Sequence, residues 1–559
     1  MWRMIKMKTD SFEYRRTCIL CGIYALFYTF CLYKNYSGVT FPFFVAGTLC
    51  FSVYFMKKQG LTLKKFSYFL ISCSLLLGVN ICLTSSWVLS FFDRCFIFLL
   101  IFMLLLHNLY DDRTWDVTRY TAAISAIVAT AVGYVFRPFT DLADLYKSKR
   151  QVPQAEAAIP GAVPPNAAGQ VPGAVPPGAA ENVPQGAPQP NDNVYVASPD
   201  GNMVRESYPA PHKKGTFSYV LLGLVISIPI LAIVLPLLIT SDAVFSSAMK
   251  HAFTFDWNAD VIGVIVMIIV MFMCAYAVWR RLEERISALD VPVPDKRIHN
   301  PVVAITVSCV MLFFYLIYCV IQIVYLFMGY GTLPEGYTYA EYAHEGFYQL
   351  VFICLINIAL VLICRKFSRD SGALKVALTL ISGCTFVMIF SAVYRMLLYI
   401  SVYRFTFLRL YVLWALLVIT LTMIGTVIHI FCPGMPFVKY CVTVLISTWI
   451  IFAYMNPDYR IAQYNLTHTN WAGYKADAEN IDDLPSDNIY VRLDLSADAA
   501  SAVVRYSQSD LFTKECLTAY TENYMEDRDI WAGEEEKERL SIRHLNYSAW
   551  NVYRLLERY

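Results

Sequence analysis

Long apolar blocks dominate this chain of 559 residues and restrict the folds that are open to it. A helix needs roughly 17–25 consecutive apolar residues to cross a bilayer, and about twelve stretches reach that length. Only 16% of the residues are charged, where a soluble domain has about 25%. The blocks therefore predict an all-α, polytopic membrane protein and exclude a large soluble enzyme as the bulk of the chain. The stretches are 17–33, 39–56, 66–83, 90–108, 120–136, 217–240, 259–279, 301–328, 346–364, 373–398, 407–430 and 438–455.

A proline-rich segment divides these blocks into two groups. It contains IPGAVPPNAAGQVPGAVPPGAA, which lacks the apolar bulk for a core and whose prolines remove backbone donors. We expect a disordered linker there. After the last block the chain turns polar and shows helical patterning. The expected organisation is a basic cytoplasmic tail (1–16), an N-terminal membrane half of four or five spans (17–136), the linker (137–216), a C-terminal membrane half of about seven spans (217–455) and a small soluble helical domain (456–559).

Lysine and arginine in short loops predict which side each loop faces, because cytoplasmic loops carry an excess of both. The tail is basic, as are 57–65, 280–285 and 365–369, whereas 331–346 contains neither residue. We therefore expect a plasma-membrane protein with a cytoplasmic N-terminus. Loop 331–346 and residues 456–559 would lie outside. The short, Ala-rich stretch 120–136 conflicts with this scheme if it crosses, because five early spans would place 280–285 outside.

The stretch SAVYRMLLYISVYRFTFLRL (391–410) carries three arginines within an apolar block. An arginine at the bilayer centre costs roughly 2.5–3.5 kcal/mol even on insertion scales. If the stretch is one helix, Arg404 falls on the opposite side from a polar stripe. A turn within 401–406 would remove Arg409 from that stripe. The stripe consists of Arg395, Tyr399, Tyr403, Thr406 and Arg409.

Three interpretations of this stripe stay open. The arginines could lie at the interface, with the tyrosines in an aromatic belt. They could line a cavity for an anion, which guanidinium groups bind in bidentate fashion. They could also form an internal ion pair with Asp93, Glu341 or Glu345. The candidate ligand-binding residues are Arg395, Tyr399, Tyr403, Thr406, Arg409, Glu341 and Glu345.

Other motifs point away from catalysis and metal binding. Glu341 and His344 have the Glu-x-x-His spacing of di-iron bundles, but those bundles need a second such motif. Cys18 and Cys21 form a lone CxxC without the second pair of a zinc site. We expect no catalytic residues, no metal and no cofactor. The net charge of +2 gives no general attraction to nucleic acid.

Several segments in the second part of the chain resemble one family. LPEGYTYAEYAHEGFYQL, YRMLLYISVYRFTFLRL, NPDYRIAQYNL, LSADAA and RHLNYSAWNVYRLL are similar to the DUF4173/DUF4153 group of bacterial multi-pass membrane proteins of unknown function. The resemblance covers roughly 300–559. All five stripe residues fit the pattern of the group. Arg404 and His344 depart from it, because the group usually has glycine and arginine there, respectively.

These observations favour a non-enzymatic role. The chain would be an envelope scaffold or sensor, or a transporter-like protein with an anion-binding cavity around Arg395 and Arg409. The alternative is a membrane-embedded transferase acting on a lipid-linked or phosphorylated substrate, with Glu341, Glu345 or Asp93 as its base. The expected partners are the lipid bilayer, an anionic small molecule or lipid headgroup, and a protein bound through 456–559 or the linker.

Overall fold

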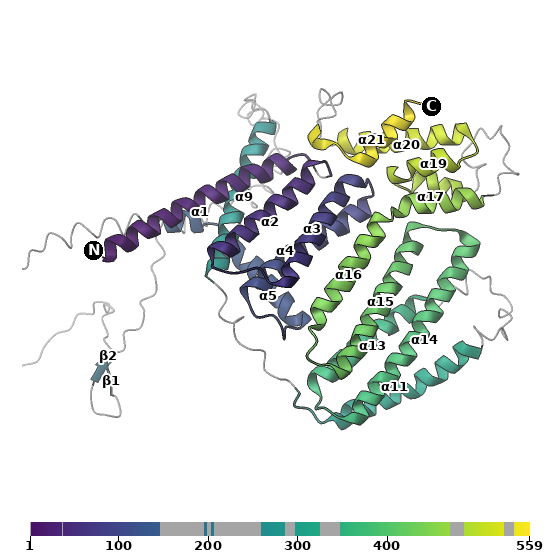
Figure 1. Cartoon of the computed structure of the whole chain (residues 1–559), viewed down its shortest axis with the longest axis horizontal. Helices are drawn as coiled ribbons and strands as arrows, with labels where there is room; N and C mark the ends of the chain where they lie inside the picture. The colour runs from purple at the N-terminus through teal and green to yellow at the C-terminus, as the bar shows by residue number, and fades with distance from the viewer. Residues whose placement is uncertain are drawn as a thin grey trace, which may run out of the picture. The chain divides into compact units, whose positions relative to one another are not determined.

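A computed structural model describes most of the chain outside the linker (Figure 1). Its contacts divide the chain into two units, 1–151 with 263–559 and 152–262. In the second unit it describes a short antiparallel hairpin, β1 (Tyr195–Ala197) and β2 (Met203–Arg205), and the start of helix α9. The described residues are 2–35, 37–145, 195–197, 203–205, 259–284, 297–324, 347–469, 486–529 and 542–559.

The first unit is helical, and the described residues include ten helices long and apolar enough to cross a membrane. The expectation of an all-α polytopic protein is confirmed. The expected span 217–240 lies outside the described residues. The ten helices are α1 (Trp2–Leu32), α2 (Thr40–Lys58), α3 (Lys65–Leu83), α4 (Trp87–Leu109), α9 (Ala259–Glu283), α11 (Pro301–Gln322), α13 (Phe347–Phe367), α14 (Gly372–Tyr403), α15 (Phe407–Phe431) and α16 (Phe437–Tyr454).

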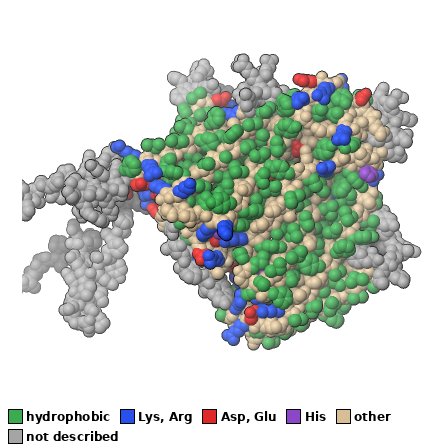
Figure 2. All heavy atoms as spheres, in the orientation of Figure 1, with side chains coloured by type: hydrophobic (Ala, Val, Ile, Leu, Met, Phe, Trp, Pro, Cys, Tyr) green, Lys and Arg blue, Asp and Glu red, His purple; other side chains and the backbone are tan. Residues whose placement is uncertain are grey.

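Apolar residues both fill the interior of this bundle and cover its flanks. Leu70, Leu77 and Ile81 of α3 recur on one helix face and are fully buried against α4. Phe313, Phe352 and other large side chains are exposed instead. Figure 2 shows hydrophobic side chains over the flanks of the helices and Lys and Arg mainly near their ends. Exposed apolar flanks are favourable on helices surrounded by lipid, because the acyl chains of the bilayer are apolar as well.

Helix α5 (Val117–Gly133) corresponds to the expected span 120–136. Its start lies beside Asp112, because Tyr120 donates to that carboxylate. Just past its end, Tyr134 donates to Glu284 at 2.6 Å, close to the end of α9. Both ends of α5 thus lie at the same end of the bundle. Residues 137–145, which composition placed in the linker, are also helical there.

The bundle has two chemically different ends. At the first, which we call the basic end, α2 stops and α3 starts, and the same end holds the last turns of α4, α9 and α13. Ion pairs join these elements: Lys58 with Glu283 at 3.3 Å, and Lys366 with Asp116. The opposite end, the cap end, holds the α1–α2 loop, the α3–α4 loop at 84–86 and the α14–α15 turn at 404–406.

The C-terminal helices pack on the cap end, and we call them the helical cap. Their core is built from Ile461, Val503 and Phe512, with Phe405 of the α14–α15 turn and Leu410 of α15 packed against it. The core of the cap is therefore continuous with the membrane part. The cap comprises α17 (Pro457–His468), α18 (Ser486–Leu493), η4 (Ala497–Ala499), α19 (Ala500–Tyr506), α20 (Asp510–Asp529), η6 (Ile542–His544) and α21 (Tyr547–Leu556).

Candidate functional site

The arginine stretch folds as two helices and a turn rather than as one helix. Helix α14 ends at Tyr403 and α15 begins at Phe407, so the assumption of one continuous helix over 391–410 is wrong. The turn contains Arg404, whose backbone has φ +64° and ψ −179°. Its side chain donates from Nη2 to the carbonyl of His468 at 3.1 Å. Arg404 therefore connects the turn to the helical cap.

Arg409 nevertheless returns to the tyrosines of the stripe. Its guanidinium lies 4.4 Å from the centroid of the Tyr399 ring and 6.0 Å from that of Tyr403. Its Nη1 also donates to the carbonyls of Tyr403 and Arg404, at the end of α14. A cation is favourable at these unpaired helix-terminal carbonyls. The turn reverses the chain so tightly that the first helical turn of α15 meets the last turn of α14.

A hollow of about 160 Å³ lies beside this stack. Tyr399, Thr406 and Arg409 line it together with apolar residues of α13 and α15. Thr406 also caps α15 by accepting from the backbone N–H of Arg409 at 3.4 Å. Arg395 is buried one turn deeper in α14, with 8% of its surface exposed. The other two predicted residues, Glu341 and Glu345, lie outside the described residues.

Asp93, proposed as a partner for the arginines, is occupied by neutral donors. It is fully buried in α4. Asn80 of α3 donates to its Oδ2 and Trp449 of α16 donates to its Oδ1, both at 2.7 Å. These hydrogen bonds tie α16 to the N-terminal membrane half. Among the described contacts, Asp93 thus joins helices and does not supply a base beside Arg409.

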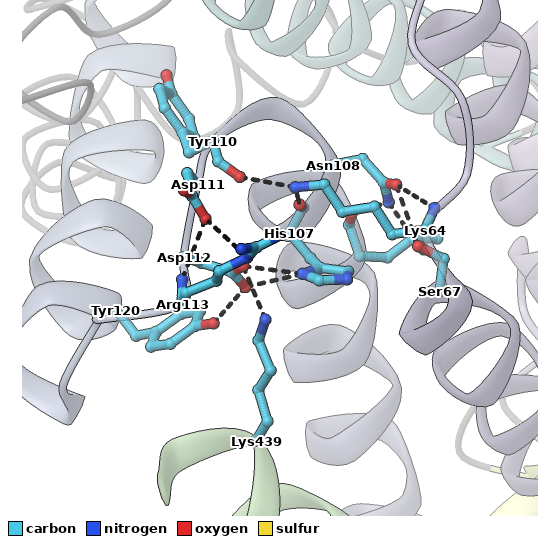
Figure 3. Close-up of polar contacts among 11 residues, drawn as sticks. Lys64, Ser67, His107, Asn108, Tyr110, Asp111, Asp112, Arg113, Tyr120 and Lys439 are labelled. Carbon is cyan, nitrogen blue, oxygen red and sulfur yellow. Dashed lines mark hydrogen bonds and ion pairs between the residues drawn. The ribbon is translucent and has the colours of Figure 1, made fainter. Parts of the chain in front are cut away.

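A second polar cluster, which sequence reasoning missed, lies at the basic end (Figure 3). Its centre is the carboxylate of Asp112, which is 2% exposed in the loop between α4 and α5. His107 contacts it through Nδ1 at 2.9 Å, Tyr120 donates to it at 2.5 Å and Lys439 of α16 donates to it at 2.8 Å. Three elements therefore converge on one acid. We call this group the Asp112 cluster.

The electrostatics of the Asp112 cluster favour an ionised carboxylate. Burial alone would raise the pKa of Asp112. The hydrogen bonds from His107, Lys439 and Tyr120 outweigh burial and hold that pKa well below its usual range. Burial, together with the same contact with Asp112, raises the pKa of the Tyr120 phenol. The phenol thus remains a donor and the carboxylate an acceptor.

Lys64 extends the cluster to α3. Its ammonium donates to the carbonyls of His107 and, at 2.9 Å, Tyr110, which terminate α4 (Figure 3). Burial lowers the pKa of Lys64. Next to it, Asn108 and Ser67 exchange hydrogen bonds of 2.9 and 3.1 Å between α4 and α3. Hydrogen bonds between side chains and to backbone carbonyls therefore join the ends of α3, α4 and α16 at the basic end.

The Asp112 cluster contains the residue types of a proton relay, but its surroundings favour a structural role in holding helices together. An aspartate that orients a histidine is part of many catalytic triads. Here the imidazole packs edge-on against Phe66, with ring centroids 5.5 Å apart. Its Nε2 is buried without a hydrogen bond among the described residues. A histidine five residues before an aspartate at a helix end was the available signal, but Lys439 is 327 residues away from Asp112 in the sequence.

Polar contacts also join the helical cap to both membrane halves. Asp498 accepts from the backbone N–H and hydroxyl of Ser85 at 2.8 and 3.0 Å, and from Thr84. Asn546 donates to the carbonyl of Thr84 at 2.8 Å. In the second half, Asn465 and Phe405 exchange hydrogen bonds of 2.9 and 3.1 Å. The cap therefore bridges the α3–α4 loop and the α14–α15 turn.

Comparison with known families gives one match for this sequence. The sequence model of a domain of unknown function, DUF4153, matches residues 71–506. The chain belongs to the DUF4153 family. The match includes most of α3, all of α4 and all described membrane helices of the second half, so the family region begins well before the resemblance noted over 300–559 and ends before it, at 506. No curated protein and no solved structure matches the chain. Membership of DUF4153 thus establishes a multi-pass membrane protein without a specified activity.

Proposed function

We propose that this DUF4153 protein is a non-enzymatic scaffold or sensor of the bacterial envelope. The observation that supports this role is the helical cap fixed across both membrane halves. Asp498 and Asn546 are 8% and 2% exposed, and they bind the α3–α4 loop. Breaking such buried bonds leaves polar groups unsatisfied, at about 1–3 kcal/mol each. A cap held in this way presents a constant surface to a partner outside the membrane.

The orientation in this proposal follows from the charges at the two ends. The basic end carries Lys57, Lys65, Arg281 and Arg369 around its short loops, which fits the cytoplasmic side. The helical cap would then face outside. Helix α11 runs from the basic end to the cap end and α13 returns, so loop 331–346 would also be external. The ten described helices and the predicted span 217–240, which lies outside the described residues, would together make eleven spans.

The proposal predicts that the cap and both halves move as one body. Spin labels attached to p-acetylphenylalanine avoid the sixteen native cysteines. One label at Gly372, where an added side chain meets no neighbour, pairs with a second at Arg113 or Gln508. In nanodiscs we expect one narrow distance distribution for each pair. Two populations for the Arg113 pair would indicate rocking of the halves, as in alternating access, and would contradict a rigid scaffold.

The hollow beside Arg409 favours a second candidate, a transporter-like protein that binds a small anion. A volume of about 160 Å³ could hold such an anion with a few waters, since each water occupies about 30 Å³. Phosphate and acetate titrated into purified protein should raise its unfolding temperature through Arg409. Arg409→Gln should remove that shift, whereas Arg113→Gln, at an 87% exposed side chain of the basic end, should keep it. Equal shifts in both variants would exclude the hollow as the site.

The transferase alternative receives less support from the described residues. It requires a carboxylate base beside Arg395 or Arg409, and Asp93 is engaged by Asn80 and Trp449. Among the described residues, no group of three or more His, Cys, Asp or Glu side chains could hold a metal ion. Transfer of the phosphoryl group from a lipid-linked phosphate to an added acceptor lipid, in the presence of purified protein, would favour the transferase over both other candidates.

A further inference from the structure

A groove lies where the helical cap meets the ends of the membrane helices. It has a volume of about 420 Å³, within the range of about 300–1,000 Å³ that small-molecule sites occupy. Four elements supply its walls: the α14–α15 turn, the first turn of α15, the end of α16 and helix α17. The lining residues are Phe405, Leu410, Met455, Arg460, Ile461, Gln463, Tyr464 and Thr467.

The groove has an apolar floor and a cationic rim. Phe405, Leu410, Met455 and Ile461 provide the floor. Arg460 is exposed on α17, and its Nη1 donates to Gln463 at 3.2 Å, which leaves Nε and Nη2 to face an anion. Among the described residues, the lining contains no Asp or Glu side chain to neutralise that charge. The groove is thus complementary to a molecule with an apolar body and a negative head.

The position of the groove along the membrane helices indicates which kind of ligand it can bind. Leu410 lies in the first turn of α15, and Met455 is the residue directly after α16. Both spans end at this level, so the groove opens where lipid headgroups meet acyl chains. Met455, one of the apolar lining residues, is itself exposed. A soluble anion would gain nothing from that floor.

We propose that this groove binds an anionic phospholipid of the leaflet on the cap side. The phosphodiester accepts from the guanidinium of Arg460, and the upper part of an acyl chain lies over Phe405 and Leu410. Tyr464 forms the wall between them, held edge-on to Phe405 with ring centroids 4.8 Å apart and stacked on His468 at 4.1 Å. This site is separate from the hollow beside Arg409 and does not depend on the scaffold proposal.

The test uses the full-length protein in phosphatidylcholine vesicles containing a trace of photoactivatable phosphatidylglycerol. After illumination, mass spectrometry quantifies lipid attached to peptides covering 455–468. Reading this segment alone separates the groove from lipid bound at the basic end. We expect attachment in the wild type, competition by excess phosphatidylglycerol, and no competition by inorganic phosphate. Equal competition by phosphate would overturn the lipid assignment.

Matched variants test the role of Arg460. Loss of a charged hydrogen bond, worth about 1.5–3 kcal/mol, should reduce labelling at least about tenfold in Arg460→Gln. Arg505→Gln is the control, because Arg505 is also exposed on the cap and stacks on its neighbour Tyr506 at 5.5 Å, as Arg460 does on Tyr459 at 5.8 Å. That variant should label like the wild type. Equal labelling of the two variants would refute the proposal.

A third variant covers the case in which Arg460→Gln fails to fold. Thr467→Trp fills the groove from an exposed position on α17. It should abolish labelling of 455–468 by both phosphatidylglycerol and phosphatidylcholine probes. Retained labelling in this variant would show that lipid touches the segment outside the groove, and the groove would be excluded as the site.

Discussion

Replacement of Arg404 by glycine should stabilise the protein. The backbone of Arg404 has φ +64° and ψ −179°, a region that is essentially reserved for glycine. A side chain held there costs about 1–3 kcal/mol. Glycine removes that cost but adds about 0.4–1 kcal/mol of unfolded-state entropy. The exposed hydrogen bond to His468, worth about 0.5 kcal/mol, is also lost. The balance is a stabilisation of about 1 kcal/mol.

Alanine at the same position separates strain from the lost hydrogen bond. Arg404→Ala loses the bond to His468 but keeps the strained backbone, so it should be slightly destabilising. A second control is Gln59→Gly, because Gln59 ends α2 with φ −78° and has no strain to release. That change should cost about 0.5–1 kcal/mol.

The assay is unfolding in mixed micelles, followed by tryptophan fluorescence, for the wild type and the three variants. The expected order of midpoints is Arg404→Gly highest, then wild type, then Arg404→Ala and Gln59→Gly. If Arg404→Gly unfolds no later than Arg404→Ala, the turn carries no strain at Arg404 and the reasoning fails. The usual glycine of the resembling group at this position is then without a structural explanation.

Three further predictions follow from buried polar groups. Asp112→Asn and Lys439→Met should each destabilise the protein by about 3–5 kcal/mol, because each leaves a buried partner unpaired. The double variant should cost less than the sum of the two single variants. Additive costs in denaturant unfolding would mean that the pair is not coupled. Burial, and then the charge of Asp498, raise the pKa of Asp458 to about 7. The folded protein therefore binds this proton more tightly than the unfolded chain, and stability should fall as the pH rises from about 4 to 7. Thermal unfolding between pH 5.5 and 8 should show this slope, and Asp458→Asn should flatten it; an unchanged slope would assign it to another group. Asp498→Ala should loosen the cap by about 1–3 kcal/mol, seen as faster hydrogen exchange at Ser85, whereas the exposed Asp510→Ala should not.

The apolar blocks were sufficient to predict a helical membrane protein, because a bilayer requires about twenty apolar residues per helical crossing and leaves a long signal in the sequence. The concentration of Lys and Arg in some loops and their absence from 331–346 likewise predicted which loops share the basic end. Periodicity could also group Tyr399, Tyr403 and Arg409. It left open whether 391–410 is one helix or turns within 401–406, since a helix and a broken helix share the same local apolar pattern.

Tertiary structure decided the contacts between distant segments. The sequence alone suggests that Asp112 is an exposed loop residue, but in the fold Lys439 and Tyr120 donate hydrogen bonds to it. Asp498 likewise accepts a hydrogen bond from Ser85, which lies 413 residues away in the sequence. Helix α5 has nearly the length of a span, and only the bonds of Tyr120 and Tyr134 show that both of its ends lie at one end of the bundle. Local sequence encodes the preference of a segment for lipid or water. Pairing of buried polar groups depends on which helices become neighbours, and that is a property of the whole packed chain.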